Sequence, residues 1–353
     1  MDFPQLDELT LESQEARTVE DTKPTSIRMA FIGAGQGGCK IADEFWAQGY
    51  RRVLMVNTTE LDMAGLECPH RLIIGGGVGG AGKNPEVGKK AAQASREEVL
   101  RACKKAFGNN VELVVVCTGA GGGTGSGSTP VLIDMARDYL ASIGAPVHVG
   151  VIAAFPKKSE GASVTNNAQS LMAHLLDEAA AKRIAPLVVV DNEKIGRMFP
   201  KASITEFFKT ANKNIAGLFN VFNELTAQAS PYSSMDSADY RSILFGGGVV
   251  FGMMPITNTD EETAIAAAVE KNVKGGLLSD SISIVGATHA GAILVASKAK
   301  LATIPQSNLD MAFETLQRVM GGKNVVLHSG VYDGPDGLGE KAMLYTIASC
   351  PVG

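Results

Sequence analysis

Six of the ten residues at positions 118–127 are glycine, and the others are threonine, alanine and serine. An apolar run at residues 111–116 precedes them and predicts a buried parallel strand. Residues 129–139 follow with the pattern of a helix. A strand, a loop of small residues and a helix start form the geometry that holds phosphate, because glycines let the backbone approach an anion and a helix N-terminus presents free N–H groups. We therefore expect a phosphate-binding loop here rather than a flexible linker.

A second glycine-rich loop, residues 33–38, follows an expected strand at residues 27–32 and opens a helix. Alone, this pattern is typical of dinucleotide-binding enzymes. In those enzymes the second strand ends in an acidic residue that binds the ribose. Here the second expected strand, residues 52–56, is followed by Asn57, and Glu60 comes about one turn later. This difference counts against a nicotinamide-dependent oxidoreductase, which stays open as the less favoured alternative.

A third loop, residues 77–84, nearly matches the phosphate-binding loop of P-loop enzymes. Asn84 stands where that motif has the serine or threonine that binds magnesium, so we reject the match. Asn84 instead suits the N-cap of a helix predicted over residues 85–107, with Pro85 at its first position. The ammonium of Lys83 either contacts a phosphate or lies in solvent.

Strands and helices alternate from residue 27 to residue 190, which predicts an α/β fold with a doubly wound parallel sheet and ligands at the carboxyl ends of its strands. Residues 203–228 follow the helical period with a wide apolar face, as expected for a long helix between two domains. Beyond Pro231 the pattern predicts a smaller mixed α/β domain. Its expected helices cover residues 261–274 and 309–320, and its expected strands cover residues 249–253, 292–296, 325–331 and 342–347.

Composition narrows the class of protein. The 353 residues are 45% hydrophobic, enough for a large core. The net charge of −5, without a basic block, disfavours nucleic acid as the main ligand. Five scattered cysteines predict reduced, mostly buried thiols in a cytoplasm. Residues 1–26 carry seven acids against two bases and no sustained apolar stripe, so we expect a disordered acidic tail.

Residues 121–127 resemble the signature of the tubulin/FtsZ superfamily of GTPases, and residues 33–46, 81–88 and 234–241 resemble three further segments of FtsZ or tubulin in the family's order. The resemblance implies a GTP-binding domain at residues 27–201, a central helix at 202–229 and a GTPase-activating domain at 230–353. It also implies GTP or GDP as ligand, with Mg²⁺. Gln36 would approach the phosphates, and the metal through water, and residues 81–84 would contact the γ-phosphate. The implied nucleotide-binding residues in the glycine-rich loops are Gly33, Gly35, Gln36, Gly37, Gly38, Lys40, Ala81, Gly82, Lys83, Asn84, Gly119, Gly121, Gly122, Gly123, Thr124, Gly125, Ser126 and Gly127, and Glu160 would reach the ribose.

Phe208 and Asn212 are four residues apart and share one face of the expected long helix. In FtsZ the matching phenylalanine stacks on guanine and the matching asparagine binds the base edge, which suits the chemistry of both side chains. The alternative is a core phenylalanine beside a surface asparagine, because Phe208 also lies on the apolar stripe.

Asp236 and Asp239 match the paired acids of the FtsZ catalytic loop, which enter the nucleotide pocket of the next subunit. Two carboxylates can orient and polarise an attacking water, or hold a cation that does. The alternative is an acidic surface turn. The chain departs from the family at Thr59, Val164 and Ser234, which replace an acid, an arginine and an asparagine, and these changes bear on metal handling and hydrolysis rate.

The resemblance therefore implies a GTP-dependent cytoskeletal protein that assembles head to tail into a homopolymer, with hydrolysis completed by the neighbouring subunit. We expect a cytoplasmic, prokaryotic protein that diverges from the standard cell division protein of this family, so that cell division, membrane remodelling and other processes stay open. The tail is a candidate site for a membrane adaptor. A structural filament that binds GTP but barely hydrolyses it is the main alternative.

Overall fold

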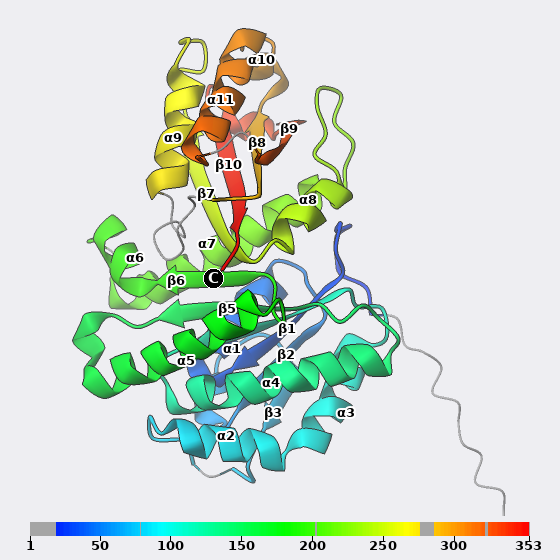
Figure 1. Cartoon of the computed structure of the whole chain (residues 1–353), viewed down its shortest axis with the longest axis vertical. Helices are drawn as coiled ribbons and strands as arrows, with labels where there is room; N and C mark the ends of the chain where they lie inside the picture. The colour runs from blue at the N-terminus through cyan, green and yellow to red at the C-terminus, as the bar shows by residue number, and fades with distance from the viewer. Residues whose placement is uncertain (1–18, 78, 202, 276–285, 322–323, 353) are drawn as a thin grey trace, which may run out of the picture.

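One continuous sheet organises the chain (Figure 1). The computed structural model describes residues 19–77, 79–201, 203–275, 286–321 and 324–352. Across these residues ten strands pair in the order β3-β2-β1-β4-β5-β6-β7-β10-β8-β9. The order runs outward from β1 in both directions, as in a doubly wound sheet.

The first six strands are parallel and confirm the predicted sheet. Most of their residues are buried, because helices cover both faces and the strands are mainly apolar. These strands are β1 (Met29–Ala34), β2 (Val53–Asn57), β3 (Arg71–Ile73), β4 (Leu113–Gly119), β5 (Val149–Phe155) and β6 (Leu187–Asp191).

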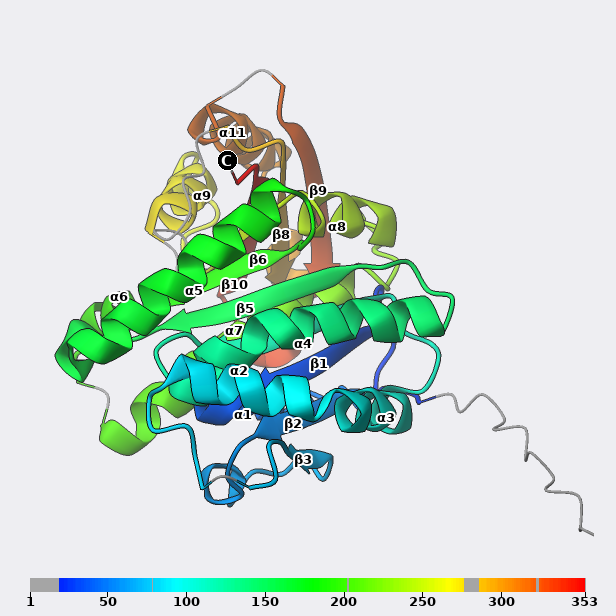
Figure 2. The same ribbon diagram turned by 60° about the horizontal axis from the view of Figure 1, so that its bottom comes forward.

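Helices pack on the two faces of this sheet (Figure 2). One face carries α2 (Pro85–Ala94), α3 (Arg96–Phe107), α4 (Gly123–Ser142) and α5 (Ala162–Ala180). The other carries α1 (Gly35–Ala47), α6 (Asn192–Met198) and α7 (Ile204–Leu225). The 3₁₀ turns η1 (Leu61–Met63) and η2 (Lys158–Glu160) lie in the loops after β2 and β5.

Two predicted helices have different bounds in the structure. The segment at residues 85–107 is two helices, because the Ser95 hydroxyl accepts a hydrogen bond from the Gly75 N–H and the chain leaves helical geometry there. Helix α4 begins at Gly123, six residues before the predicted start, so much of the glycine-rich stretch is helix rather than loop. Glycine disfavours a helix interior in isolation, and here tertiary packing overrides that preference.

The second half of the chain extends the same sheet. Strand β7 continues it through a single parallel pair, Leu187 with Gly248. Beyond it, β7–β10 and β10–β8 are antiparallel and β8–β9 is parallel, which confirms the mixed pattern. The strands are β7 (Gly248–Ile256), β8 (His289–Ala296), β9 (Val326–Asp333) and β10 (Ala342–Cys350), and the helices are α8 (Ser237–Leu244), α9 (Ala264–Gly275), α10 (Lys298–Leu301) and α11 (Gln306–Val319), with the turn η3 (Asp336–Leu338).

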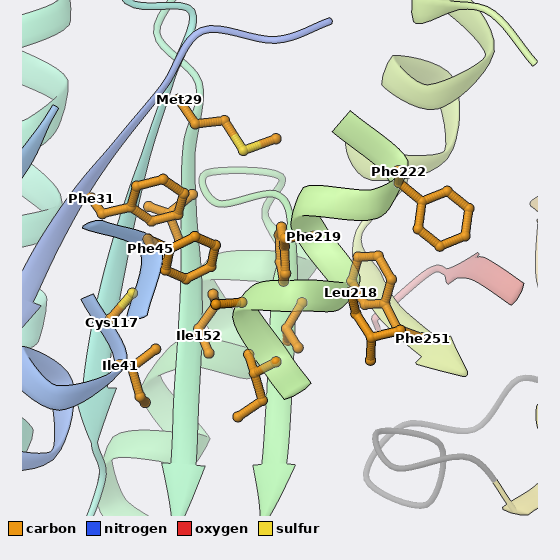
Figure 3. Packing of buried hydrophobic residues seen from close by; sticks show 14 of the residues in the cluster. Met29, Phe31, Ile41, Phe45, Cys117, Ile152, Leu218, Phe219, Phe222 and Phe251 are labelled. Carbon is orange, nitrogen blue, oxygen red and sulfur yellow. The ribbon is translucent and has the colours of Figure 1, made fainter. Parts of the chain in front are cut away.

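Aromatic residues of α7 join the two halves (Figure 3). The Phe219 ring meets Phe45 of α1 at 5.8 Å between centroids and Phe251 of β7 at 4.7 Å. One turn further on, Phe222 also faces Phe251, and it stacks on Tyr240 of α8. Because all five rings are buried, α7 is the central helix that its periodicity predicted.

The state of the cysteines agrees with the composition. All five cysteines are free and buried, as predicted. Burial raises the pKa of Cys103 to about 12 and of Cys68 to about 11, so these thiols stay protonated at neutral pH. In the described parts of the chain no helix combines the length and apolarity needed to cross a membrane.

The expected tail ends earlier than residue 26. Residues 1–18 lie outside the described residues, but residues 19–26 are bound to the folded body. The Asp21 carboxylate pairs with the Arg52 guanidinium at 2.6 Å, and their side chains are only 6% and 3% exposed. Asp21 also accepts the Arg51 N–H at 2.8 Å, and the Thr22 N–H donates to the Gly49 carbonyl. The acid count suggested a solvated segment, but one of these acids is the partner of a buried cation.

We predict that Asp21→Asn lowers the free energy of unfolding by about 3 kcal/mol or more, because removing one partner of a buried ion pair leaves an uncompensated charge. Urea unfolding of the purified chain measures this. Glu20→Gln, at the exposed neighbouring residue, is the matched control and is expected to change little. Equal unfolding midpoints for the two variants would contradict the prediction.

Candidate functional site

The carboxyl ends of the parallel strands bring four loops together. They follow β1, β3, β4 and β5, and they contain or adjoin the glycine-rich segments singled out from the sequence. The N-terminus of α4 faces the start of α2, and the loop between β3 and α2 supplies Ala81 to Asn84. The glycine-rich segments are therefore neighbours in space although they are far apart in the sequence.

Most of the glycines allow close packing of backbone. A Cβ on Gly127 would lie 1.9 Å from the Pro85 carbonyl oxygen, and one on Gly123 would lie 2.6 Å from the Asn84 nitrogen. A larger residue at either position would push α4 away from the start of α2. The same holds at other glycines of these loops, where an added Cβ would lie within 3.4 Å of another residue. These glycines are Gly33, Gly35, Gly37, Gly38, Gly119, Gly121 and Gly125.

Two of the glycines implied in nucleotide binding face open space instead. A Cβ on Gly82 would have no neighbour within 4 Å, and one on Gly122 would only reach the Gly119 carbonyl oxygen at 4.0 Å. Gly122 is exposed and is the N-cap of α4, whose first N–H groups lack partners within the helix. Gly82 and Lys83 both have positive φ, at 54° and 61°. These features leave a backbone surface open to an anion at the start of α4.

The hydroxyls expected to donate to phosphate make hydrogen bonds within the chain. The Thr124 and Thr58 hydroxyls are 2.7 Å apart and buried, and the Ser126 hydroxyl donates to the Gly122 carbonyl. These bonds fix the first turn of α4. The anion-binding capacity of this loop therefore rests chiefly on its N–H groups.

The remaining polar candidates surround these loops. Gln36 and Lys40 on α1 are exposed, as are Lys83 and Asn84, and the Asn84 side chain accepts the Glu86 N–H as the predicted N-cap. Glu160 is exposed in the β5–α5 loop, where its carboxylate accepts the Lys157 N–H at 2.8 Å.

Two adjacent phenylalanines near the start of α7 differ in burial. Phe207 is buried, and the Lys157 ammonium lies 3.6 Å from its ring centroid. Phe208 is 43% exposed, so the alternative of a core residue is wrong for its side chain. Asn212 is half-buried one turn further on. The face of α7 that carries Phe208 and Asn212 therefore presents an exposed aromatic ring and an amide, as the i, i+4 spacing predicted.

Asp236 and Asp239 lie elsewhere. They form a reciprocal cap at the start of α8: the Asp236 carboxylate accepts the N–H groups of Ala238 and Asp239, and the Asp239 carboxylate accepts the Asp236 N–H at 3.0 Å. Buried Met235 anchors this loop, because the Tyr332 hydroxyl binds both its N–H and its carbonyl. The acidic loop is therefore firmly placed at the surface.

Helix α8 lies at the amino edge of the parallel sheet. Arg241 donates to the carbonyl of Ser26, just before β1, and to the carboxylate of Glu112, just before β4. The candidate phosphate loops are at the carboxyl edge. The structure therefore brings the glycine-rich loops together and keeps the two aspartates apart from them.

A known protein family matches the part of the chain that forms the parallel strands. Residues 28–200 match the family model described as Tubulin/FtsZ family, GTPase domain. The chain is a divergent, FtsZ-like member of the tubulin/FtsZ family.

Its relatives span most of its length. The cell division protein FtsZ 1 of Pyrococcus horikoshii is 27% identical over 321 residues, which cover 90% of this chain and 77% of the relative. The GTPγS-form protofilament of TubZ from Bacillus thuringiensis serovar israelensis has a TM-score of 0.78 at 20% identity, covering 93% of this chain and 87% of that one. CetZ2 from Haloferax volcanii, a GTPγS-bound protofilament, has a TM-score of 0.75 at 22% identity, covering 91% and 92%. These structures confirm the predicted fold.

One residue that joins these loops was not predicted from the sequence. The Asn167 amide on α5 donates to the Lys83 carbonyl at 2.8 Å and to the Gly121 carbonyl at 3.1 Å. It thereby ties the loop before α2 to the loop after β4, and it holds Lys83 in a left-handed conformation that costs a non-glycine residue about 1–2 kcal/mol. No local pattern reveals such a residue, since both partners are distant in sequence.

We predict that Asn167→Asp increases the rate of tryptic cleavage after Lys83 several-fold, because a carboxylate cannot donate to either carbonyl and repels both. Limited proteolysis with mass spectrometry measures the cleavage. Asn166→Asp, at the exposed neighbour on α5, is the matched control. If both variants were cleaved at the parental rate, Asn167 would not hold the loop.

Proposed function

We propose that this chain binds GTP and GDP in the loops at the carboxyl edge of its parallel sheet and assembles head to tail into filaments. Each subunit would then supply Asp236 and Asp239 to the nucleotide of its neighbour. The family membership supports a GTPase at this general level. Shared hydrolysis in this chain is the finer part of the proposal.

The proposal rests on the positions of the phosphate loops and of the acidic loop before α8, which lie toward opposite ends of α7 (Figure 1). The 22 residues of α7 make a helix roughly 33 Å long at 1.5 Å per residue. Phe207, near its start, packs against Lys157 in the loop after β5. Asn223, near its end, binds Ile27 just before β1. A rigid helix of this length prevents one subunit from bringing its own aspartates to its own phosphate loops, so a second subunit must provide them.

Such a contact joins unlike ends of two identical chains. A heterologous contact that does not close on itself produces an open filament. The TubZ and CetZ2 structures are described as protofilaments, which supports this mode of assembly. The proposal makes the polymer the hydrolysing species, and the free subunit a binding protein.

The loops suit a polyphosphate. The backbone at Gly82 and Gly122 faces open space, and the N-terminus of α4 adds a positive dipole end. Among the described residues no three His, Cys, Asp or Glu side chains form a group suited to a metal ion. Mg²⁺ would therefore be held chiefly by the phosphates, with exposed Gln36 acting through water.

The relatives support a wider cellular role as part of the proposal. FtsZ 1 is described as a cell division protein, and we propose a comparable cytoskeletal role in a prokaryotic cytoplasm. A membrane adaptor acting through residues 1–18 belongs to the same proposal, and those residues lie outside the described part of the chain.

Recognition of the guanine base gives the first test. We predict that Asn212→Ala lowers GTP affinity by about 1–3 kcal/mol and narrows the preference for GTP over ATP, because hydrogen bonds to the base edge are lost. Fluorescent-nucleotide competition measures both affinities. Asn214→Ala removes the same amide about 200° round the helix and is the control. An unchanged preference in the Asn212 variant would move base recognition elsewhere.

Shared hydrolysis gives the second test. We predict that Asp236→Asn and Asp239→Asn still bind GTP and pellet as filaments, while turnover per subunit falls by about 10²–10⁴. Asparagine keeps the carbonyl oxygen that caps α8, and so preserves the fold while removing the charge. Phosphate release and pelleting at several protein concentrations measure both effects.

Asp310→Asn, on the exposed side of α11, is the control for loss of a negative charge. In the parent, turnover per subunit is expected to rise steeply with concentration. Turnover that is independent of concentration would overturn shared hydrolysis, and filaments without phosphate release in the parent would favour the structural-filament alternative.

A further inference from the structure

The Asp239 carboxylate has a second partner besides its own helix. One oxygen accepts the Asp236 N–H in the cap of α8. The other oxygen lies 2.8 Å from Nδ1 of His328, which comes from β9. The far nitrogen of the ring, Nε2, lies 3.2 Å from the Ser242 hydroxyl on α8. The imidazole is therefore held at both nitrogens, with Asp239 at one end and Ser242 at the other.

We propose that His328 is a positioning residue for Asp239, holding that carboxylate in the orientation in which it acts on the neighbouring subunit's nucleotide. This inference rests on the proposed function, because Asp239 has a reaction to serve only if it enters the neighbour's site. It adds a residue of β9 to a site otherwise built from α8 and the loop before it.

The cap of α8 does not need this contact. The reciprocal cap between Asp236 and Asp239 uses only one Asp239 oxygen. The bond from His328 fixes the other oxygen and so fixes the plane of the carboxylate. The Asp239 side chain is still 31% exposed, against 15% for His328, so the acid faces outward with the imidazole behind it. This arrangement leaves the carboxylate accessible to a second subunit.

The charge of the pair depends on the protonation of His328. Histidine changes its charge near neutral pH. A protonated imidazole neutralises Asp239, and a neutralised carboxylate attracts a water proton or a cation less strongly. A neutral imidazole still donates from Nδ1 and leaves the negative charge in place. Turnover is therefore expected to be higher when the imidazole is neutral than when it is protonated.

Two other ionisable side chains near His328 and Asp239 have shifted pKa values. His289 of β8 lies parallel to the His328 ring at 6.5 Å, and burial, followed by the nearby His328, lowers the pKa of His289. Asp236 and Asp239 lie near Tyr332 of β9; burial, followed by a smaller contribution from these carboxylates, raises the pKa of its hydroxyl, which stays protonated. His328 is the histidine in direct contact with the Asp239 carboxylate.

Two substitutions separate orientation from titration. His328→Asn places an amide N–H near the position of Nδ1, so it keeps a donor to Asp239 but does not titrate. His328→Ala removes the donor. We expect turnover of assembled subunits to fall by about 10- to 100-fold in His328→Ala, the scale of a misplaced catalytic group. We expect His328→Asn to recover much of this loss and to lose the dependence of turnover on pH that the charge of the imidazole causes.

His174→Gln, at an exposed histidine on α5, is the matched control and is expected to keep the parental profile. Each rate is measured on pelleted filaments, so a defect in assembly is counted separately. Equal turnover and an unchanged pH profile in both His328 variants would overturn the proposal. A uniform loss of thermal stability and of filaments in both variants, with parental turnover per assembled subunit, would show a merely structural role and overturn it as well.

A measurement without nucleotide distinguishes this inference from the proposed function. In NMR spectra of the unassembled chain, the ring resonances of His328 are expected to shift in Asp239→Asn relative to the parent, because the carboxylate that accepts from Nδ1 is lost. Identical resonances would refute the pair itself. A clear difference in a parent chain that hydrolyses no GTP would confirm the pair and overturn both the proposed hydrolysis and the positioning role.

Discussion

The packing of α7 between the two halves of the sheet is the interaction on which the rest of the structure depends. Phe219 touches Phe45 on one side and Phe251 on the other, and Phe222 adds a contact to Tyr240. These rings are fully or almost fully buried, so separating the halves would expose several large apolar side chains to water. The same packing sets the distance between the phosphate loops and the acidic loop, and so makes the proposed site a property of two subunits.

Several residues with an apparent ligand role support the fold as well. Gly123 and Gly127 let the backbones of α4 and α2 approach, and Gly122 leaves an open surface at the end of the same helix. Likewise Asp236 and Asp239 cap α8 while their carboxylates stay at least partly exposed. Where one residue serves both purposes, a substitution that removes charge but keeps the hydrogen bond is the informative one. Replacement by alanine would mix the two effects.

Much of the architecture followed from local pattern. Apolar runs such as residues 111–116 predicted the parallel strands, and the period of residues 203–228 predicted α7, because burial on both faces and burial along a stripe leave different spacings. The bounds of α4 and the break at Ser95 did not follow. Glycine content argued against a helix at residue 123, and a hydrogen bond from distant Gly75 interrupts the helix at Ser95.

By itself, the sequence determined the order of strands and helices, the family, and the residue types at the candidate site, since these depend on periodicity and on short motifs. Only the tertiary structure decided which side chains meet. It buried Asp21 against Arg52, exposed Phe208 while burying Phe207, and brought Asn167 and His328 to loops far away in the chain. Such contacts join segments whose separation in sequence carries no local signal, because they form only when α7 and the sheet have fixed the positions of both partners.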